Sequence, residues 1–175
     1  MHAIQVSIAR RHHIPAIISL VNQAYRPAPD AAGWTHETGL VTGERINEQQ
    51  VTALLDRSQS IILIATRKND LLGCVHIEQQ DEHAMIGMLA VLPRCQVGGI
   101  GKQLLAHAEN HAAQQFHVKT LRMVVVSARH ALIEFYLRRG YQRTGQTMPY
   151  PLDADAGQPM TANMTIEVLE KSAFV

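Results

Sequence analysis

The sequence feature that most constrains the fold is an apolar run that leads through a glycine-rich turn directly into a helix. Residues 88–91 read as the end of a strand, and the apolar positions from Ile100 to Ala112 recur with helical spacing. Between them lies the turn Gln96-Val97-Gly98-Gly99-Ile100-Gly101-Lys102. Successive backbone N–H groups at a helix start form a concave anion site, which glycine leaves open and the helix dipole reinforces. The sequence therefore predicts a phosphate-binding turn.

Two common phosphate motifs do not fit this turn. A Walker A loop needs glycine where Gln96 stands, and Ser or Thr where Gln103 stands. A dinucleotide fingerprint needs glycine or alanine at Leu104, together with an early position in a parallel sheet. The turn therefore belongs to another class of phosphate site, unless it is an ordinary connection between a strand and a helix.

Hydrophobic periodicity predicts one mixed α/β (α+β) domain over residues 1–175, in the order βααβββαβαββ. Strands are expected at residues 4–8, 61–66, 71–78, 84–91, 121–126, 141–146 and 162–169. Helices are expected at residues 14–25, 47–57, 100–112 and 130–139. The short polar stretches between the second, third and fourth strands favour antiparallel neighbours.

Local signals add detail to these elements. Asn47 and Gln50 resemble a capping box, and Gly140 suits the left-handed residue that ends a helix. The alternating strand at 4–8 is expected at a sheet margin, and the continuous apolar strand at 121–126 is expected to be covered on both faces. Residues 26–43 hold prolines, glycines and the only tryptophan, so we expect a long binding loop there.

Composition excludes several classes of function. The 16 Lys and Arg residues against 15 Asp and Glu residues give a formal net charge of +1, which argues against a nucleic-acid partner. Cys74 and Cys95 lie far apart, no charged-then-apolar leader is evident, and no apolar run approaches the roughly 20 residues that span a bilayer. We expect a cytoplasmic monomer or homodimer with reduced thiols and no membrane partner.

Two sequence blocks resemble one known family. Gln96, Gly99 and Gly101 match the pattern Gln/Arg-x-x-Gly-x-Gly/Ala, which is similar to the pyrophosphate loop of the GNAT superfamily of acetyl-CoA-dependent N-acetyltransferases. Residues 132–141 resemble the family's late helix, which ends in an aromatic-Tyr-x-x-x-Gly-aromatic signature. The resemblance implies a mostly antiparallel sheet of about seven strands flanked by four helices, splayed between strands 84–91 and 121–126.

The resemblance also implies a reaction. Acetyl would pass from acetyl-CoA, the cosubstrate, to a primary amine of a small molecule or peptide by direct attack, without a metal. The strand backbone would pair with the pantetheine arm, and the N–H groups of the turn would hold the pyrophosphate. The implied cofactor-binding residues are Leu89, Ala90, Val91, Gln96, Val97, Gly98, Gly99, Ile100, Gly101 and Lys102, although Lys102 could equally be a solvated residue of the first helical turn.

Candidate catalytic residues follow from the same resemblance. Tyr136 occupies the position that commonly protonates the departing sulfur in the family, and its alternative is a core aromatic. An amine with a pKa near 10 also needs a base or a water chain. Relatives often use a carboxylate in or beside strand 84–91, which has none, but alternation along strand 71–78 could bring Glu78 or His76 to the cleft or leave both at a polar edge.

Other residues stay open at this level. Loop residues Trp34 to Glu37 would border the acceptor, and Glu37 could bind the acceptor ammonium or relay its proton. Arg129 stands where many relatives carry an asparagine, so it would touch a phosphate or a substrate carboxylate, or lie on the surface. His107 and His111 share a helix face but have no third metal ligand, so no metal is expected.

Residues 146–161 form a proline-bearing excursion that would cover the acceptor pocket or remain a surface loop. The main functional alternative to an enzyme is a non-catalytic module that binds coenzyme A. A polyamine or nucleic-acid partner protein is a third possibility, which the near-neutral charge disfavours.

Overall fold

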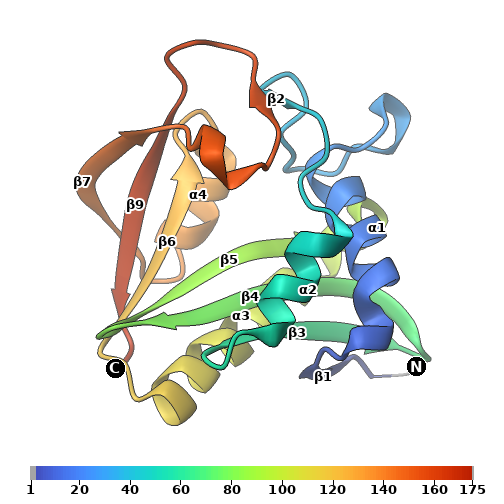
Figure 1. Ribbon diagram of the computed structural model, residues 1–175, viewed down its shortest axis with the longest axis vertical. Helices are drawn as coiled ribbons and strands as arrows, with labels where there is room; N and C mark the ends of the chain where they lie inside the picture. Colours follow the sequence, from blue (N-terminus) through green and yellow to red (C-terminus); the bar gives the residue numbers. More distant parts are fainter. Residues whose placement is uncertain (1–2, 175) are drawn as a thin grey trace.

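A seven-stranded sheet runs through the molecule, which is a computed structural model that describes residues 3–174 (Figure 1). The order across the sheet is β1-β3-β4-β5-β6-β9-β7. The strands are β1 (Gln5–Ile8), β3 (Ser60–Arg67), β4 (Asp70–Gln80), β5 (His83–Val91), β6 (Thr120–Val126), β7 (Gln142–Pro149) and β9 (Thr165–Ser172). All neighbours are antiparallel except β5 and β6. The expected mixed, mostly antiparallel sheet is confirmed, with β1 at one margin.

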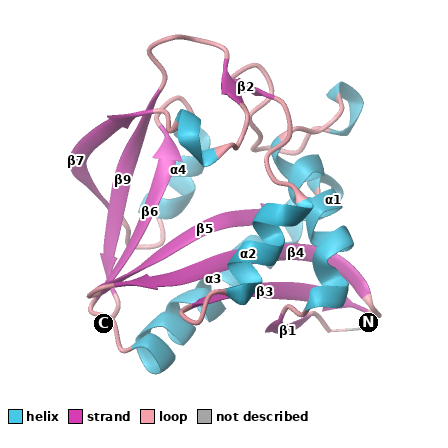
Figure 2. Ribbon diagram, viewed as in Figure 1, coloured by secondary structure: helices cyan, strands magenta, loops and turns pink. Residues whose placement is uncertain are grey.

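Four α-helices flank the sheet, as expected. They are α1 (Ile14–Tyr25), α2 (Glu48–Asp56), α3 (Ile100–His111) and α4 (His130–Leu137). Helices α1 and α2 lie on one face of the sheet and α3 on the other (Figure 2). The capping box at the start of α2 is confirmed, because Asn47 and Gln50 each accept the other's backbone N–H at 2.9 Å. Gly140 has φ of +90°, the left-handed conformation expected after α4.

Helix α3 lies close to the sheet because β4 carries a glycine beneath it. A Cβ atom at Gly73 would stand 2.8 Å from Leu104 Cδ1 and 2.9 Å from the carbonyl oxygen of Ala90. Both distances are shorter than atoms tolerate, so only glycine allows this approach. The helix buries Ile100, Leu104 and Leu105 against the strands, which fixes the position of its N-terminus.

The sheet splays where its one parallel pair begins. Strands β5 and β6 pair only between His83–Met85 and Thr120–Arg122, and beyond that register they diverge (Figure 1). In β5, Met88 and Leu89 together oppose Val75 of β4, which makes a β-bulge, and Met88 has φ of +49°. The expected splay between these two strands is therefore confirmed, and a backbone irregularity lies beside it.

The structure corrects the expectation that the strand at 121–126 is covered on both faces. Val124 is 42% exposed, because β5 has turned away and left that face of β6 open. A second correction concerns the long loop at 26–43, which contains strand β2 (Val41–Thr42). That strand pairs with β8 (Gln158–Pro159) in a small separate sheet, so distant segments meet there. Within residues 3–174, no helix is long and apolar enough to cross a membrane.

Candidate active site

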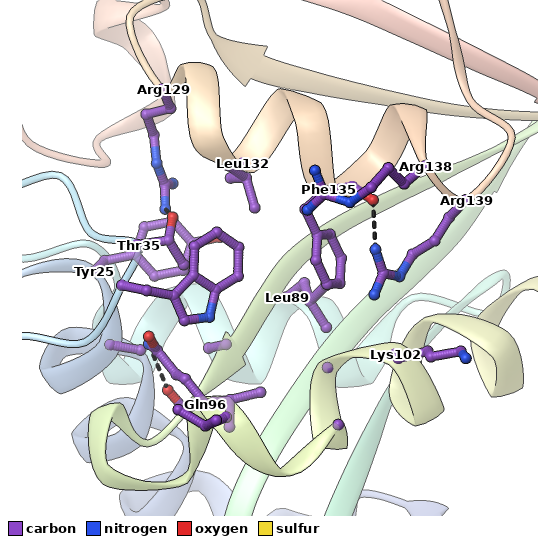
Figure 3. A pocket seen from close by; sticks show the side chains of 17 residues that line it. Tyr25, Thr35, Leu89, Gln96, Lys102, Arg129, Leu132, Phe135, Arg138 and Arg139 are labelled. Carbon is purple, nitrogen blue, oxygen red and sulfur yellow. Dashed lines mark hydrogen bonds between the residues drawn. The ribbon is translucent and has the colours of Figure 1, made fainter.

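A cavity of about 320 Å³, here called the turn cavity, lies between β5, the start of α3 and the inner side of α4 (Figure 3). Its walls include every expected cofactor-binding residue except two. Gly98 lies at the surface beside it, and the Ile100 side chain is buried in the core at 1% exposure. The cavity is lined by Leu89, Ala90, Val91, Gln96, Val97, Gly99, Gly101 and Lys102 from the expected set.

The start of α3 presents free backbone donors to this cavity. Gly99 caps the helix with φ of +74°, and the first helical hydrogen bond runs from the Gln103 N–H to the Gly99 carbonyl oxygen at 3.1 Å. The N–H groups of Ile100, Gly101 and Lys102 therefore have no acceptor within the helix. A Cβ atom on Gly99 would meet nothing within 4 Å, so the space in front of these donors is open. This cradle fits a pyrophosphate.

Gln96 holds the turn in place. Its Nε2 donates to the Val91 carbonyl oxygen at 3.2 Å, which ties the turn back to the end of β5 (Figure 3). A Cβ atom at Gly33 would overlap the Gln96 amide, so the loop after α1 packs directly on this side chain. Gln96 thus acts on the geometry of the turn as well as lining the cavity.

Basic side chains line the same cavity from two sides. Lys102 comes from α3, and Arg138 and Arg139 come from the end of α4 (Figure 3). The Arg139 guanidinium lies 3.4 Å over the ring centre of Phe135 and donates to the Phe135 carbonyl oxygen at 2.6 Å. Positive charge on this side complements the phosphates of a coenzyme.

A second cavity of about 300 Å³, here called the inner cavity, opens between the diverging strands β5 and β6. Tyr25, Leu89, Arg129 and Leu132 line both cavities, so the two adjoin at these side chains. A group held along β5 in the turn cavity therefore faces a second ligand in the inner cavity near Leu89.

Tyr136 lies at the inner cavity. Its ring packs edge-on against Phe135 and Tyr141, with ring centres 5.3 and 5.9 Å away, and the residue is only 6% exposed. Among residues 3–174, its hydroxyl has no hydrogen-bond partner. Burial raises the pKa of Tyr136 above its ordinary value, so the phenol keeps its proton at neutral pH. Tyr136 is thus both a core aromatic and a free proton donor at a cavity wall.

Glu78 and His76 both reach the inner cavity, as alternation along β4 suggested. The Glu78 carboxylate accepts two bonds from Arg57 at 3.1 and 3.2 Å. His76 Nε2 lies 2.8 Å from Ser60 Oγ, and that hydroxyl donates to the Leu54 carbonyl oxygen at 2.8 Å. Nε2 must therefore carry the imidazole proton, while Nδ1 has no partner among residues 3–174. Burial lowers the pKa of His76 to about 4, so the ring is neutral at neutral pH.

Glu37 sits between two arginines. Its carboxylate pairs with Arg26 at 2.8 Å and with Arg129 at 3.4 Å, and the residue is 5% exposed. The Arg129 side chain is 9% exposed, donates to Thr35 Oγ1 at 2.8 Å and lies over the Tyr25 ring at 5.3 Å. The surface alternative for Arg129 is therefore wrong.

The loop after α1 divides between the two cavities. Trp34 and Thr35 line the turn cavity and Glu37 lines the inner cavity, whereas His36 lines neither. The four residues therefore do not line one common cavity, and their place beside the acceptor stays a prediction. Trp34 packs against Phe135, with ring centres 5.7 Å apart, because the loop folds down toward α4.

The excursion after β7 covers the inner cavity. Tyr150, Pro151, Ala154 and Ala156 line it, so the segment is not a detached surface loop. Contacts from the other half of the chain anchor this cover. Arg26 donates to the Ala156 carbonyl oxygen at 2.8 Å, and Gln50 Nε2 donates to the carbonyl oxygens of Ala154 and Asp155 at 3.2 and 3.0 Å.

Some lining residues were not singled out from the sequence. Tyr25 appeared only as the last apolar position of α1, and Arg45 lay in an unremarkable polar stretch before α2. Their roles arise because α1 ends beside β5 and the segment before α2 returns across it. As for the helical histidines, residues 3–174 contain no cluster of three or more potential metal ligands, and His111 packs against Phe116.

The chain resembles known proteins in both sequence and fold. Residues 17–141 match the model of the acetyltransferase (GNAT) family. The fold is similar to that of the ribosomal-protein-S18-alanine N-acetyltransferase from Escherichia coli, with a TM-score of 0.73 and 16% identity over 99% of this chain and 96% of that one. It is also similar to the PaiA N-acetyltransferase from Thermoplasma acidophilum in complex with coenzyme A, with a TM-score of 0.74 and 17% identity over 97% and 99% of the chains.

An N-acetyltransferase from Staphylococcus aureus Mu50 has a TM-score of 0.75 at 14% identity, with 99% of both chains covered. A search of curated protein sequences found no match. The structural likenesses, at these low identities, show the fold, whereas the family model spans most of the sequence. The chain belongs to the GNAT acetyltransferase family.

Proposed function

We propose that this protein is an N-acetyltransferase that moves the acetyl group of acetyl-CoA to a primary amine by direct attack. The observation that carries the proposal is the meeting of the two cavities at Leu89. One cavity ends in a helix-start cradle for phosphates, and the other contains a protonated tyrosine and polar side chains. The two reactants can therefore approach each other without a covalent intermediate on the protein.

The turn cavity would take the donor. The N–H groups at the start of α3 would hold the pyrophosphate, and Lys102, Arg138 and Arg139 would add positive charge around it. The edge of β5 that faces β6 has no strand partner beyond Met85, so the backbone from Leu89 to Val91 is available to pair with the pantetheine amides. When bound, acetyl-CoA supplies an activated thioester carbonyl.

The bulge in β5 would stabilise charge on that carbonyl. A bulge turns backbone groups out of the ladder, and Met88 in its left-handed conformation redirects the chain just before Leu89. We propose that the N–H of Leu89 or Ala90 donates to the carbonyl oxygen as negative charge develops there. One such donor accelerates acyl transfer by roughly 100-fold to 1000-fold.

Tyr136 would give its proton to the departing thiolate of coenzyme A. Tyr136 lines the inner cavity, and its hydroxyl is protonated at neutral pH and has no hydrogen-bond acceptor among residues 3–174. A thiolate that leaves without a proton donor would instead be a better nucleophile for the reverse reaction. General acid catalysis of this kind contributes roughly 100-fold or more.

For removal of the amine proton, we propose Glu78, acting directly or through water. It lines the inner cavity, and its carboxylate is held by two hydrogen bonds from Arg57. Glu37 is the second candidate, but both of its oxygens face arginines, so we propose that it mainly orients Arg129.

The experiment that tests this proposal is acetyl-CoA turnover with a broad panel of small amines and peptides. Release of coenzyme A that depends on the amine, together with an N-acetylated product identified by mass spectrometry, would support an enzyme. Tight binding of acetyl-CoA with no turnover across the panel would refute it and favour a non-catalytic coenzyme A-binding module.

A further inference from the structure

We propose that the acceptor carries a carboxylate in addition to its amine, and that Arg45 binds this carboxylate. The inference rests on the proposed function only in taking the inner cavity as the acceptor side. It concerns which chemical groups the cavity can bind, and the charged side chains in its walls decide this.

The carboxylates that line the inner cavity are already paired with arginines. The acidic residues in its walls are Glu37 and Glu78. Glu37 pairs with Arg26 and Arg129, and Glu78 pairs with Arg57. The two acidic side chains that line the cavity are therefore both already paired with arginine, so these walls carry no excess negative charge for the several ammonium groups of a polycationic acceptor.

Arg45 is the opposite case. It lines the inner cavity, but among residues 3–174 no carboxylate lies within ion-pair distance of its guanidinium and no acceptor takes a hydrogen bond from it. Its nearest described partner is the face of the Tyr25 ring, 5.0 Å from the guanidinium carbon. A half-buried guanidinium offers up to five donors, which water satisfies poorly in a narrow cavity.

The backbone of Arg45 is held firmly. Its N–H donates to Asn22 Oδ1 at 2.7 Å, and the next N–H, of Ile46, shares that oxygen at 3.3 Å. The Asn22 amide in turn donates to the Ile46 carbonyl oxygen at 3.0 Å. Helix α1 thus fixes the start of this side chain, which then extends over Tyr25. A guanidinium positioned in advance binds a planar carboxylate through two parallel hydrogen bonds.

Tyr25 links this charge to the reacting centre. The guanidinium carbons of Arg45 and Arg129 lie 5.0 and 5.3 Å from the centre of the Tyr25 ring. Tyr25 also lines both cavities. A carboxylate bound by Arg45 would therefore lie beside Tyr25, one of the residues at which the two cavities adjoin. We propose that the amine of the same small molecule extends from there to the junction at Leu89.

The size and cover of the cavity restrict the acceptor further. About 300 Å³ of space, roofed by Pro151 and Ala154, suits a molecule of amino-acid size rather than an extended peptide. The other walls are largely apolar, with Met85, Ile86 and Ile166 among them. We infer an amino acid or a similar small amine with a carboxylate and an apolar body.

The first test measures binding, which does not require turnover. Calorimetry in the presence of coenzyme A would compare N-acetyl amino acids with their carboxamides, across a panel of apolar side chains. We expect at least one carboxylate to bind roughly tenfold to a hundredfold more tightly than its amide, in keeping with a hydrogen-bonded charge pair. Arg45→Gln should abolish this preference, and Arg45→Lys should retain only part of it.

Arg67→Gln serves as the matched control, because Arg67 is exposed at the end of β3 and lines neither cavity. It should leave the preference unchanged. The second test compares turnover of amino acids with that of the amines formed by their decarboxylation. Wild type should prefer the amino acid, and Arg45→Glu should prefer the amine.

The outcomes separate this inference from the proposed function. If Arg45→Gln loses a carboxylate preference that wild type shows, yet no amine is acetylated, the carboxylate site stands and the enzyme proposal fails. If no carboxylate in the panel binds better than its amide, or if folded Arg45→Gln keeps the preference, the carboxylate site is refuted.

Discussion

Tyr136→Phe isolates the proton that the proposed mechanism places on the leaving thiol. The substitution removes one oxygen and leaves the packed ring in place. Because the hydroxyl has no hydrogen-bond partner among residues 3–174, the free energy of unfolding should change by about 0.5 kcal/mol or less. Loss of a general acid should lower kcat by roughly 100-fold, which corresponds to about 2.7 kcal/mol in the activation barrier.

Tyr141→Phe is the matched control. Tyr141 packs against Tyr136, but its hydroxyl donates to Glu109 Oε1 at 3.0 Å and it lines neither cavity. Loss of a hydrogen bond to a charged group should lower stability by about 2 kcal/mol, or the melting temperature by roughly 4–8 °C, without lowering kcat at a temperature where the variant is folded. The two tyrosines therefore have opposite expected profiles.

The assay follows coenzyme A release at saturating amine, with acetyl-CoA affinity measured by calorimetry and stability by thermal melting. We expect Tyr136→Phe to bind acetyl-CoA as wild type does, since Tyr136 does not line the turn cavity. A Tyr136→Phe variant with wild-type kcat would refute the acid role. An equal loss of kcat in Tyr141→Phe, at a temperature where that variant is folded, would show that packing, not the proton, is responsible.

Three further predictions concern other parts of the molecule. Gly99→Glu should abolish acetyl-CoA binding in calorimetry, because it places a carboxylate beside the N–H donors at the start of α3. Gly98→Ala is the control and should bind acetyl-CoA normally, since its Cβ atom would meet nothing within 4 Å. Equal affinities of the two variants would contradict the phosphate cradle. Between pH 6.5 and 4 the unfolded state binds more protons than the folded state at His76, so wild type should lose roughly 3 kcal/mol more stability across that window than His76→Gln in denaturant titrations. Parallel pH profiles would contradict the buried neutral imidazole. Burial raises the pKa of Cys74 to about 12, so a thiol reagent should label Cys95 alone in the native protein and both cysteines after unfolding; labelling of both in the native state would contradict that burial.

Much of the fold could be predicted from the sequence because its signals are local. The capping box at Asn47 and the left-handed Gly140 act within one helical turn, so residue types alone reveal them. The glycine turn is similarly self-contained, since its donors come from the helix that it opens. These features required no knowledge of distant neighbours.

The parts that could not be predicted depend on distant segments. Val124 reads as a buried strand residue, but it is exposed because β5 turns away from β6. Strand β2 is two residues long and forms only because it pairs with β8, which comes from a distant part of the sequence. Strand β9 begins at Thr165 instead of residue 162, because Met160 and Met164 are used in turns, with the Met160 N–H bonded to Leu40.

The candidate site also combines local signals, which the sequence reveals, with contacts between distant segments, which it does not. The glycine turn could be identified as a motif, but the partners of Glu37 could not. Arg26 contacts Glu37 from the end of α1, and Arg129 contacts it from the turn before α4, more than ninety residues after Glu37 in the sequence. The charge balance that favours a carboxylate-bearing acceptor depends on these pairs, so it emerges only from the folded chain.

The central claim is that acetyl passes directly from the donor in the turn cavity to an amine in the inner cavity. A single-turnover experiment tests it, with protein in excess over acetyl-CoA and amino acids as acceptors, quenched and followed by mass spectrometry. We predict that the acetyl group appears on the amine at the rate at which coenzyme A is released, and that the intact protein never gains an acetyl group. Acetylated protein that forms before the product, or acetyl-CoA that stays intact while bound beside saturating acceptor, would contradict the account.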